Sequence, residues 1–355
     1  MRHTRRPTLA VILASAVLVV AGCSGSATST TKPSSLVFPS FGSVYQTATN
    51  AAIVPCFQNA TGIKAQVLVG QTPDWVAKVK ADPSNPPVQV ILGVGQSTYQ
   101  TIDAGLVQKL DPTKIPNMAQ IPDTFKTPFG GYAVSFDGGG VGIAYNKNAI
   151  PNPPSTWKEF IDNTIAGDYG NSVGLLGPTN SFWSELMFWY TDQVYGQTFD
   201  QNGINFAFSK IKAMLPHVRA YSESITDAGT LLTSGEVNII PWLDGRAFAY
   251  IQGGASNIGF AHFQGGTIFV PVDLMLVKNA SPFANDFINC ALSTSVQDVF
   301  AKDFPGYSMT NPGVTYPAAA QGKLPSVNSL IYPPERQLGQ MQPSLVQQWD
   351  QQVGG

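Results

Sequence analysis

Apolar and polar positions along the chain follow two periods, one typical of strands and one typical of helices. Short apolar runs at 36–38, 63–69 and 88–92 have the length of strands, and the stretches between them repeat apolar residues every three or four positions. Strands that alternate with helices predict an α/β fold with a mainly parallel sheet. The first expected helix is 43–59, and Pro55 predicts a kink or an early end because proline lacks a backbone N–H.

The same alternation continues in the second half of the chain. Two strands are expected at 132–136 and 141–145, interrupted by the glycines at 138–140. A helix follows Ser155, where Thr156 and Glu159 have the spacing of a capping box. The last fifty residues are rich in Pro, Gln and Gly and predict only short helical pieces. Further strands are expected at 173–176, 236–242, 258–261 and 267–276, and further helices at 183–195, 206–215, 282–292 and 296–304.

The N-terminus differs in composition from the rest of the chain. Basic residues at 2–6 precede an uncharged apolar run at 9–22, which is too short to span a bilayer and fits the core of a signal peptide. The run ends in the tetrapeptide VAGC, which resembles the lipobox of bacterial lipoproteins and implies lipid on Cys23. The alternative is an ordinary signal peptide with an incidental cysteine. Residues 1–23 are therefore the expected signal segment, and the Ser- and Thr-rich stretch 24–35 predicts a flexible tether.

Charge and residue types argue against several functions. The formal net charge is −2 and no basic stretch occurs, so we expect no nucleic-acid partner. His3, His217 and His262 do not have metal-ligand spacing, and no nucleophile elbow is present. Gly93-Val94-Gly95 lacks the third glycine of a dinucleotide fingerprint. We therefore expect no catalytic residue, no metal and no cofactor.

The chain has three cysteines. If Cys23 carries lipid, Cys56 and Cys290 remain as a pair in an oxidising compartment. Such a pair either forms a disulfide or stays as two buried thiols.

Short motifs occur in a characteristic order over nearly the whole chain. They are TGI at 61–63, GLVQKLD at 105–111, VGIAYN at 141–146, STW at 155–157, IKAMLPHV at 211–218, SGEVN at 234–238, GGTIF at 265–269 and GY at 306–307. In this order they resemble the type 2 periplasmic-binding-protein fold and, within it, the spermidine/putrescine-binding group.

This resemblance implies two α/β lobes with a ligand cleft and a hinge between them. The first lobe would comprise 36–137 and 272–310, and the second 138–271 and 311–355. The crossings between the lobes would lie near 135–140 and 271–273, and a glycine-rich crossover tolerates the dihedral changes of hinge closure. Cys56 and Cys290 would then both lie in the first lobe.

Candidate ligand-binding residues lie in loops that follow predicted strands, because open α/β sheets bind ligands at the carboxyl ends of their strands. Pocket aromatics of the spermidine/putrescine group correspond to Phe41, Trp242 and Tyr307. Its amine-binding carboxylates correspond to Asn180 and Trp183, so this part of the pocket differs. The candidate set is Phe41, Gln96, Ser97, Asp137, Asn180, Trp183, Trp242, Asp244, Arg246, Asp273 and Tyr307.

Several roles within this set stay open. Glu185 lies near the altered positions and could compensate for them, whereas Asp273 is one residue from the expected acidic position. Arg246 either binds a carboxylate or phosphonate of the ligand or pairs with Asp244. Each candidate tryptophan either stacks on the ligand or packs in the core.

Together these observations predict an extracytoplasmic solute-binding protein of an ABC importer. We expect an exported monomer at the periplasm or cell surface, held to the membrane by lipid, that captures a polyamine or related amine and passes it to the permease. A zwitterion, such as an aminophosphonate or an amino-acid derivative, is the alternative ligand. An enzyme on the same fold and a lipid-anchored sensor or scaffold are the alternative functions.

Overall fold

The structure, a computed structural model, describes residues 32–304, 306–318, 320, 324, 325 and 329–354. The chain divides into two units, Met1–Pro33 and Ser34–Gly355, and every helix and strand named below belongs to the second. Cys23 and the predicted signal peptide lie outside the described residues. Among the described helices, none combines the length and the apolar character needed to cross a bilayer.

The strands form one small parallel pair and one large mixed sheet. The pair consists of β1 (Ser35–Ser40) and β2 (Lys64–Val69). The large sheet contains β3 (Val90–Val94), β4 (Val134–Asn146), β5 (Val173–Leu176), β6 (Val218–Ser222), β7 (Ile239–Leu243), β8 (Ile258–His262), β9 (Thr267–Leu276), β10 (Ser308–Met309) and β11 (Leu330–Ile331). Its order is β11-β9-β4-β7-β5-β6, with β3 paired to β9 and with β8 and β10 paired to β4.

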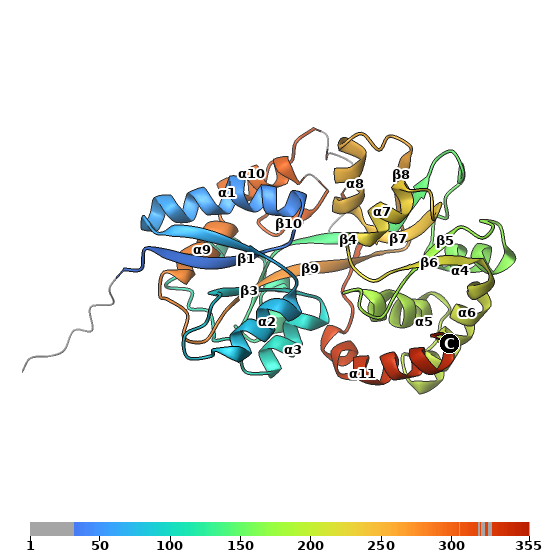
Figure 1. Ribbon diagram of the computed structural model, residues 1–355, viewed down its shortest axis with the longest axis horizontal. Helices are drawn as coiled ribbons and strands as arrows, with labels where there is room; N and C mark the ends of the chain where they lie inside the picture. The colour runs from blue at the N-terminus through green and yellow to red at the C-terminus, as the bar shows by residue number, and fades with distance from the viewer. Residues whose placement is uncertain (1–31, 305, 319, 321–323, 326–328, 355) are drawn as a thin grey trace, which may run out of the picture. The chain divides into compact units, whose positions relative to one another are not determined.

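The large sheet is mixed, in contrast to the expected mainly parallel sheet. The long strands β4 and β9 pair with each other in antiparallel fashion, and each also takes antiparallel partners such as β7 and β3. Parallel pairing is found for β5 with β6 and with β7. Figure 1 shows β4 and β9 running side by side between two groups of helices.

A single strand, β4, replaces the two strands expected on either side of the glycines. Gly138 and Gly140 pair with residues of β9, so the strand continues through them. The side chain of Phe269 fills the space beside Gly138, where a Cβ would lie 2.2 Å from its ring. The glycines therefore let neighbouring side chains pack on the strand instead of interrupting it.

The helices gather around two parts of the strand system. Figure 1 shows α1 and α10 on one side of β1 and β3, and α2 and α3 on the other. The first group is α1 (Val44–Thr61), α2 (Thr72–Ala81), α3 (Gln96–Asp103), α9 (Ala284–Leu292) and α10 (Thr294–Asp303). The second is α4 (Trp157–Ala166), α5 (Thr191–Val194), α6 (Gln201–Met214), α7 (Asp227–Thr233), α8 (Asp244–Gln252) and α11 (Glu335–Gln352). Short turns complete the elements: η1 (Pro116–Gln120), η2 (Asp123–Phe125), η3 (Thr127–Phe129), the π-helical η4 (Glu185–Tyr190) and η5 (Leu215–His217).

Helix α1 continues through Pro55 and ends where Gly62 takes a left-handed conformation with φ 64°. Its inner face packs on β1 and α9, where the rings of Phe38 and Phe287 stack at 4.0 Å. The structure also joins these helices covalently, because Cys56 of α1 and Cys290 of α9 form a disulfide. The cysteine pair is thus bonded, and it ties together two segments of the first helix group.

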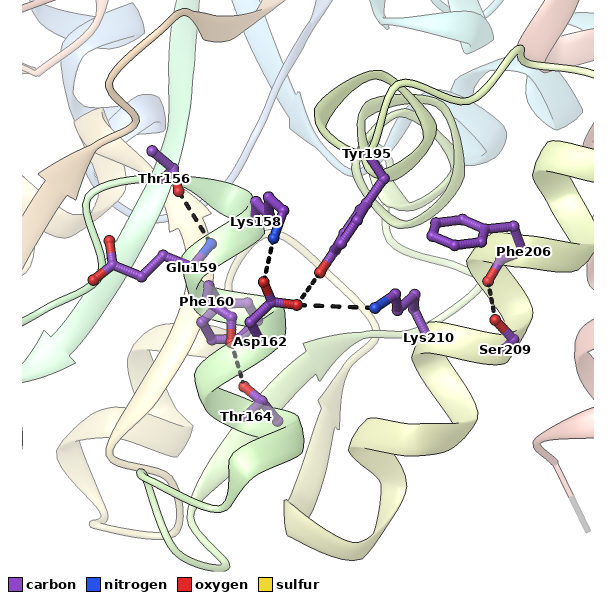
Figure 2. A network of polar contacts seen from close by, with 10 residues as sticks. All are labelled: Thr156, Lys158, Glu159, Phe160, Asp162, Thr164, Tyr195, Phe206, Ser209 and Lys210. Atoms are coloured by element: carbon purple, nitrogen blue, oxygen red, sulfur yellow. Dashed lines mark hydrogen bonds and ion pairs between the residues drawn. The ribbon is translucent and has the colours of Figure 1, made fainter.

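Polar contacts position α4 against α5 and α6 (Figure 2). The Thr156 hydroxyl oxygen accepts from the Glu159 backbone N–H at 3.0 Å, as the capping box predicts. The Glu159 carboxylate accepts from the Ser155 N–H, so the reciprocal bond of the box shifts by one residue. Asp162 then accepts from Tyr195 and also pairs with lysines of α4 and α6.

The C-terminal segment forms one long helix, α11, although its composition predicted short pieces. Leu338, Leu345 and Trp349 are buried at its inner face. Gly339 near its start packs on α3, whereas the Trp349 ring lies 5.4 Å from the Trp183 ring near η4. Helix α11 of the second group therefore also contacts α3 of the first group.

Candidate functional site

A cavity of about 410 Å³ lies where loops from the two helix groups meet. Gln96 and Ser97 line it from the start of α3, directly after β3. Asn180 lines it from the loop after β5, and Gln342 of α11 lies at its wall. The cavity is thus placed at the carboxyl ends of strands, as the sheet rule predicts.

The polar side chains of this cavity differ in whether they have a hydrogen-bonding atom free for a ligand. Ser97 Oγ donates to the Val94 carbonyl at 2.8 Å, and Asn180 Nδ2 donates to the Ser222 carbonyl at 3.2 Å. Ser97 therefore holds its own loop, and Asn180 ties its loop to the end of β6. Gln96 Oε1, in contrast, is buried and has no hydrogen-bond partner among the described residues.

Two glutamates meet beside Gly95, next to this cavity. A Cβ on Gly95 would lie 3.1 Å from Glu185 Oε1 and 3.1 Å from Glu335 Oε2. The two side chains are 1% and 8% exposed, and Ser184 Oγ donates to Glu185 Oε2 at 3.0 Å. Glu185 Oε1 and both Glu335 oxygens have no partner among the described residues. Buried acceptors of this kind cost free energy unless a donor reaches them.

Asp273 adds a third buried carboxylate to form an acidic cluster of Glu185, Glu335 and Asp273. It comes from β9 and accepts from Ser135 Oγ and from Thr98 Oγ1, both at 2.6 Å. Burial raises the pKa of Asp273 to about 7. None of the three carboxylates forms an ion pair within the described part of the chain.

Burial also raises the pKa of both glutamates. For Glu335 the pKa lies well above its ordinary value, first because of burial and then because the Glu185 charge is close. Burial is the largest cause for Glu185 as well. Like charges that share a site do not ionise together unless a cation joins them.

An aromatic cavity of about 250 Å³ borders the acidic cluster. Asp273 and Glu335 are part of its lining. The Phe125 ring lies 5.8 Å from the Phe269 ring, in a T-shaped arrangement. Aromatic faces next to carboxylates stabilise organic cations, because ring faces are negative. The aromatic side chains that line this cavity are Tyr99, Phe125, Phe129, Phe269 and Tyr332.

A second group of ionisable side chains, the mixed cluster, consists of the buried Asp137, Asp244 and Arg246 and the partly buried His262. His262 Nε2 and Asp244 Oδ2 are 3.0 Å apart, and Asp244 Oδ1 accepts from the Gly245 N–H. Burial raises the pKa of Asp244 and raises that of Asp137 well above its ordinary value. Arg246 opposes the increase at Asp137, so here acidic and basic groups share one site.

The remaining aromatic candidates are placed differently. Phe41 is 3% exposed and packs against Tyr45 and Trp75. Tyr307 lies beside Gly139, where a Cβ would meet its ring at 2.6 Å. Neither residue lines either of the two cavities above or a third cavity that Trp242 lines.

The two candidate tryptophans also differ from each other. Trp183 is fully buried between the rings of Phe188 and Trp349 and lines none of these three cavities. Trp242 lines a cavity of about 350 Å³, while its Nε1 donates to the Ile225 carbonyl at 2.7 Å. Trp242 is 1% exposed but lines a cavity, whereas Trp183 is part of the core.

Sequence reasoning missed Glu335 and the aromatic wall. Glu335 begins α11 directly after Pro333 and Pro334, a proline-then-acid pattern typical of a helix start. Burial of Leu338 and Leu345 on one face would have supported that reading. Glu185, noted only as a possible substitute, belongs to the acidic cluster, and the first turn of the π-helical η4 directs it there.

No group of His, Cys, Asp and Glu in the described part of the chain is arranged to hold a metal ion. The candidate site thus consists of carboxylates, aromatic rings and polar loops.

Comparisons with known proteins show the family of the chain. The family of bacterial extracellular solute-binding proteins matches residues 52–325. The spermidine/putrescine-binding periplasmic protein of Escherichia coli (strain K12) is 25% identical over 183 residues, 50% of this chain and 49% of that protein. The chain covers 42% to 49% of the length of the spermidine/putrescine-binding relatives that it matches.

Solved structures match nearly the whole chain. An extracellular solute-binding protein from Bordetella parapertussis has a TM-score of 0.76 and 25% identity, covering 90% of this chain and 99% of that one. The PBP MotA from A. tumefaciens B6, in complex with glucopine, has a TM-score of 0.75 and 21% identity, covering 89% and 99%. The mixed sheet, the loop-lined cavities and the family match lead to one conclusion: the chain belongs to the bacterial extracellular solute-binding proteins.

Proposed function

We propose that the protein captures a small organic amine in the cleft beside Gly95 and delivers it to the permease of an ABC importer. The observation that carries this proposal is the acidic cluster, which buries three carboxylates without a basic partner in the described part of the chain. A buried charge of one sign is costly, and a bound cation offsets that cost.

The surroundings of the acidic cluster favour an organic cation over a bare metal ion. The aromatic cavity next to Asp273 and Glu335 supplies faces for methylene groups and ammonium charges. Gln96 Oε1 adds an acceptor for a further N–H group. The E. coli relative, whose name states spermidine/putrescine binding, supports the same ligand class.

Cleft closure is the proposed mechanism. The first lobe, 36–137 with 272–310, and the second, 138–271 with 311–355, would move about β4 and β9, which run between the helix groups. Glu185 and Glu335 come from η4 and α11, whereas Gln96 comes from α3, so a ligand contacts elements of both groups. No step of this mechanism needs chemistry on the ligand.

A thermal-shift screen tests the ligand class directly. Putrescine, spermidine and cadaverine are compared with a neutral sugar and with sodium chloride at equal ionic strength. An amine at 100 times its Kd should add about 2.7 kcal/mol to the free energy of unfolding. Stabilisation by the sugar, with no effect of any amine, would show that the ligand class is wrong.

The anchor is a separate part of the proposal. We infer that Cys23 carries lipid and holds a monomer at the outer face of the membrane. Metabolic labelling with a fatty acid should mark the full chain and fail to mark the Cys23→Ser variant. Equal labelling of both would contradict the anchor, and gel filtration of the mature chain reports the monomer.

A further inference from the structure

A third cavity, of about 350 Å³, lies between the start of α1 and the helices α7 and α8. Its lining includes Ser43 and Val44 at the start of α1, together with Trp242, Arg246 and Tyr250. The Trp242 and Tyr250 rings pack at 5.3 Å, so one wall is aromatic.

Arg246 is the charged group of this cavity. Its side chain is 4% exposed, and Nη1 donates to the Gly42 carbonyl over a long distance of 3.5 Å. Nε is buried without any hydrogen-bond partner among the described residues. The guanidinium carbon lies 5.5 Å from the centre of the Phe304 ring. Among the described residues, Nε–H of this buried cation is therefore free and Nη1 is only weakly engaged, while the Tyr307 hydroxyl group also interacts with the guanidinium.

The neighbouring carboxylates do not neutralise Arg246 by direct pairing. Both oxygens of Asp137 lack a hydrogen-bond partner among the described residues. Asp244 is engaged by His262 and by the Gly245 N–H. No ion pair of Arg246 occurs in the described part of the chain. A buried guanidinium in this state is complementary to an oxyanion.

The start of α1 points to the same ligand chemistry. This helix has 18 residues, and its N-cap residue Ser43 makes no side-chain hydrogen bond to the first turn. The uncapped N–H groups and the helix dipole favour negative charge at this end. Val44 of the first turn and Arg246 line one cavity, so two anion-favouring groups lie at its wall.

This cavity is a neighbour of the proposed amine site. Ile225 lines the cavity of about 410 Å³ and the next residue, Thr226, lines this one. Trp242 holds that loop through its bond to the Ile225 carbonyl. One loop therefore separates the cavity beside Gln96 from the cavity that Arg246 lines.

We propose that Arg246 and the first turn of α1 form an anion subsite, so that the solute carries a carboxylate or a similar oxyanion as well as an ammonium group. This inference rests on the proposed amine-binding function and narrows it to zwitterionic or amphoteric solutes. A plain polyamine would leave the subsite without its charge partner.

A matched pair of ligands tests the subsite. L-lysine is cadaverine with one added carboxylate, so their affinity ratio measured by calorimetry isolates that group. Charged hydrogen bonds of this kind correspond to a ratio of roughly 10- to 150-fold in favour of lysine. The ratio should fall towards one in Arg246→Gln and take an intermediate value in Arg246→Lys, which keeps the charge without the planar fork. Exposed Arg219→Gln is the matched control and should keep the wild-type ratio.

Inorganic phosphate tests the subsite without any ammonium group. It should raise the melting temperature of the wild type at millimolar concentration and leave that of Arg246→Gln unchanged. If cadaverine binds as tightly as lysine, or if the affinity ratio is unchanged in Arg246→Gln, the anion subsite is wrong while the proposed amine binding stands. No response of the wild type to phosphate would also contradict the anion subsite. Failure of every amine to bind would contradict the proposed amine-binding function, and the phosphate result would still report on the subsite.

Discussion

The acidic cluster and the mixed cluster are both buried, but they differ in how their charges are balanced. In the acidic cluster, Glu185, Glu335 and Asp273 gather with hydroxyl donors and no basic side chain. In the mixed cluster, Asp244 has His262 at 3.0 Å, and the Arg246 charge lowers the pKa of Asp137 against the effect of burial.

This difference indicates which cluster depends on a ligand of opposite charge. The fold itself supplies part of the compensation in the mixed cluster, so its acids depend less on a ligand of opposite charge. The fold supplies only neutral donors to the acidic cluster, so its carboxylates raise the free energy of the empty protein. Excess buried charge of one sign therefore supports the proposal of a cationic ligand.

The largest expected effect follows removal of the glutamate charges. Glu185→Gln and Glu335→Gln keep the side-chain shape, and each should weaken amine binding roughly 30-fold or more, because a buried ion-pair partner is lost. The same variants should raise the free energy of unfolding of the empty protein, since a buried charge disappears. Calorimetry gives the first quantity and urea denaturation the second.

A matched control separates this effect from a general change in charge. Glu236→Gln makes the same substitution at an exposed position and should change neither quantity measurably. If Glu335→Gln keeps wild-type amine affinity, the acidic cluster does not hold the ligand.

The second prediction concerns pH. Burial raises the pKa of Asp273 from 3.8 to about 7, so the folded protein holds this proton more tightly than the unfolded chain. The bound proton therefore adds at most about 4 kcal/mol to the free energy of unfolding. This contribution is fully present below about pH 4 and is lost as the pH rises through 7. Amine affinity should change in the opposite sense and increase from pH 5 to pH 8, because the cation prefers the ionised carboxylate.

Asp273→Asn isolates this contribution, since the pKa values of Asp137 and Asp244 are raised by burial too. In urea denaturation without ligand, the free energy of unfolding of this variant should depend less on pH than that of the wild type. An unchanged slope between pH 5 and pH 8 would show that Asp273 stays ionised in the folded state.

Local pattern predicted many elements but not how charges meet across the fold. The helix expected at 43–59 is α1, at Val44–Thr61, because its spacing and the following Gly62 are local signals. The glycines of β4 suggested a break, since only the structure shows Phe269 packed beside Gly138. A pattern within one segment carries no information about such a neighbour.

The candidate site was predictable in the same partial way. The sheet rule selected Gln96 and Asn180, which follow strands directly. Glu335 lies 150 residues after Glu185 in the chain, and their meeting at Gly95 depends on the path of α11. Position within the resembled group suggested Glu185 and Asp273 as near matches but did not include Glu335.

The third prediction concerns the sign of the effect in the mixed cluster. Asp244→Asn removes the charge that faces His262 and should lower the free energy of unfolding by about 1–3 kcal/mol. In the acidic cluster the corresponding loss of a carboxylate is stabilising, so the two clusters should respond oppositely in urea denaturation. A gain in stability from Asp244→Asn would remove the distinction between them.

The smallest expected effect is at the surface, where Arg336 pairs with Asp103 at 2.8 Å and joins α11 to α3. Both side chains are about half exposed (55% and 49%), so solvent and salt screen the pair. Arg336→Gln should lower the free energy of unfolding by less than about 1 kcal/mol, and high salt should erase the difference.

Glu335 should stay in the acidic cluster of this variant, because buried Leu338 and Leu345 hold α11. Amine affinity should therefore change less than about 3-fold. A loss as large as that of Glu335→Gln would mean that the exposed ion pair, and not core packing, positions the acidic cluster.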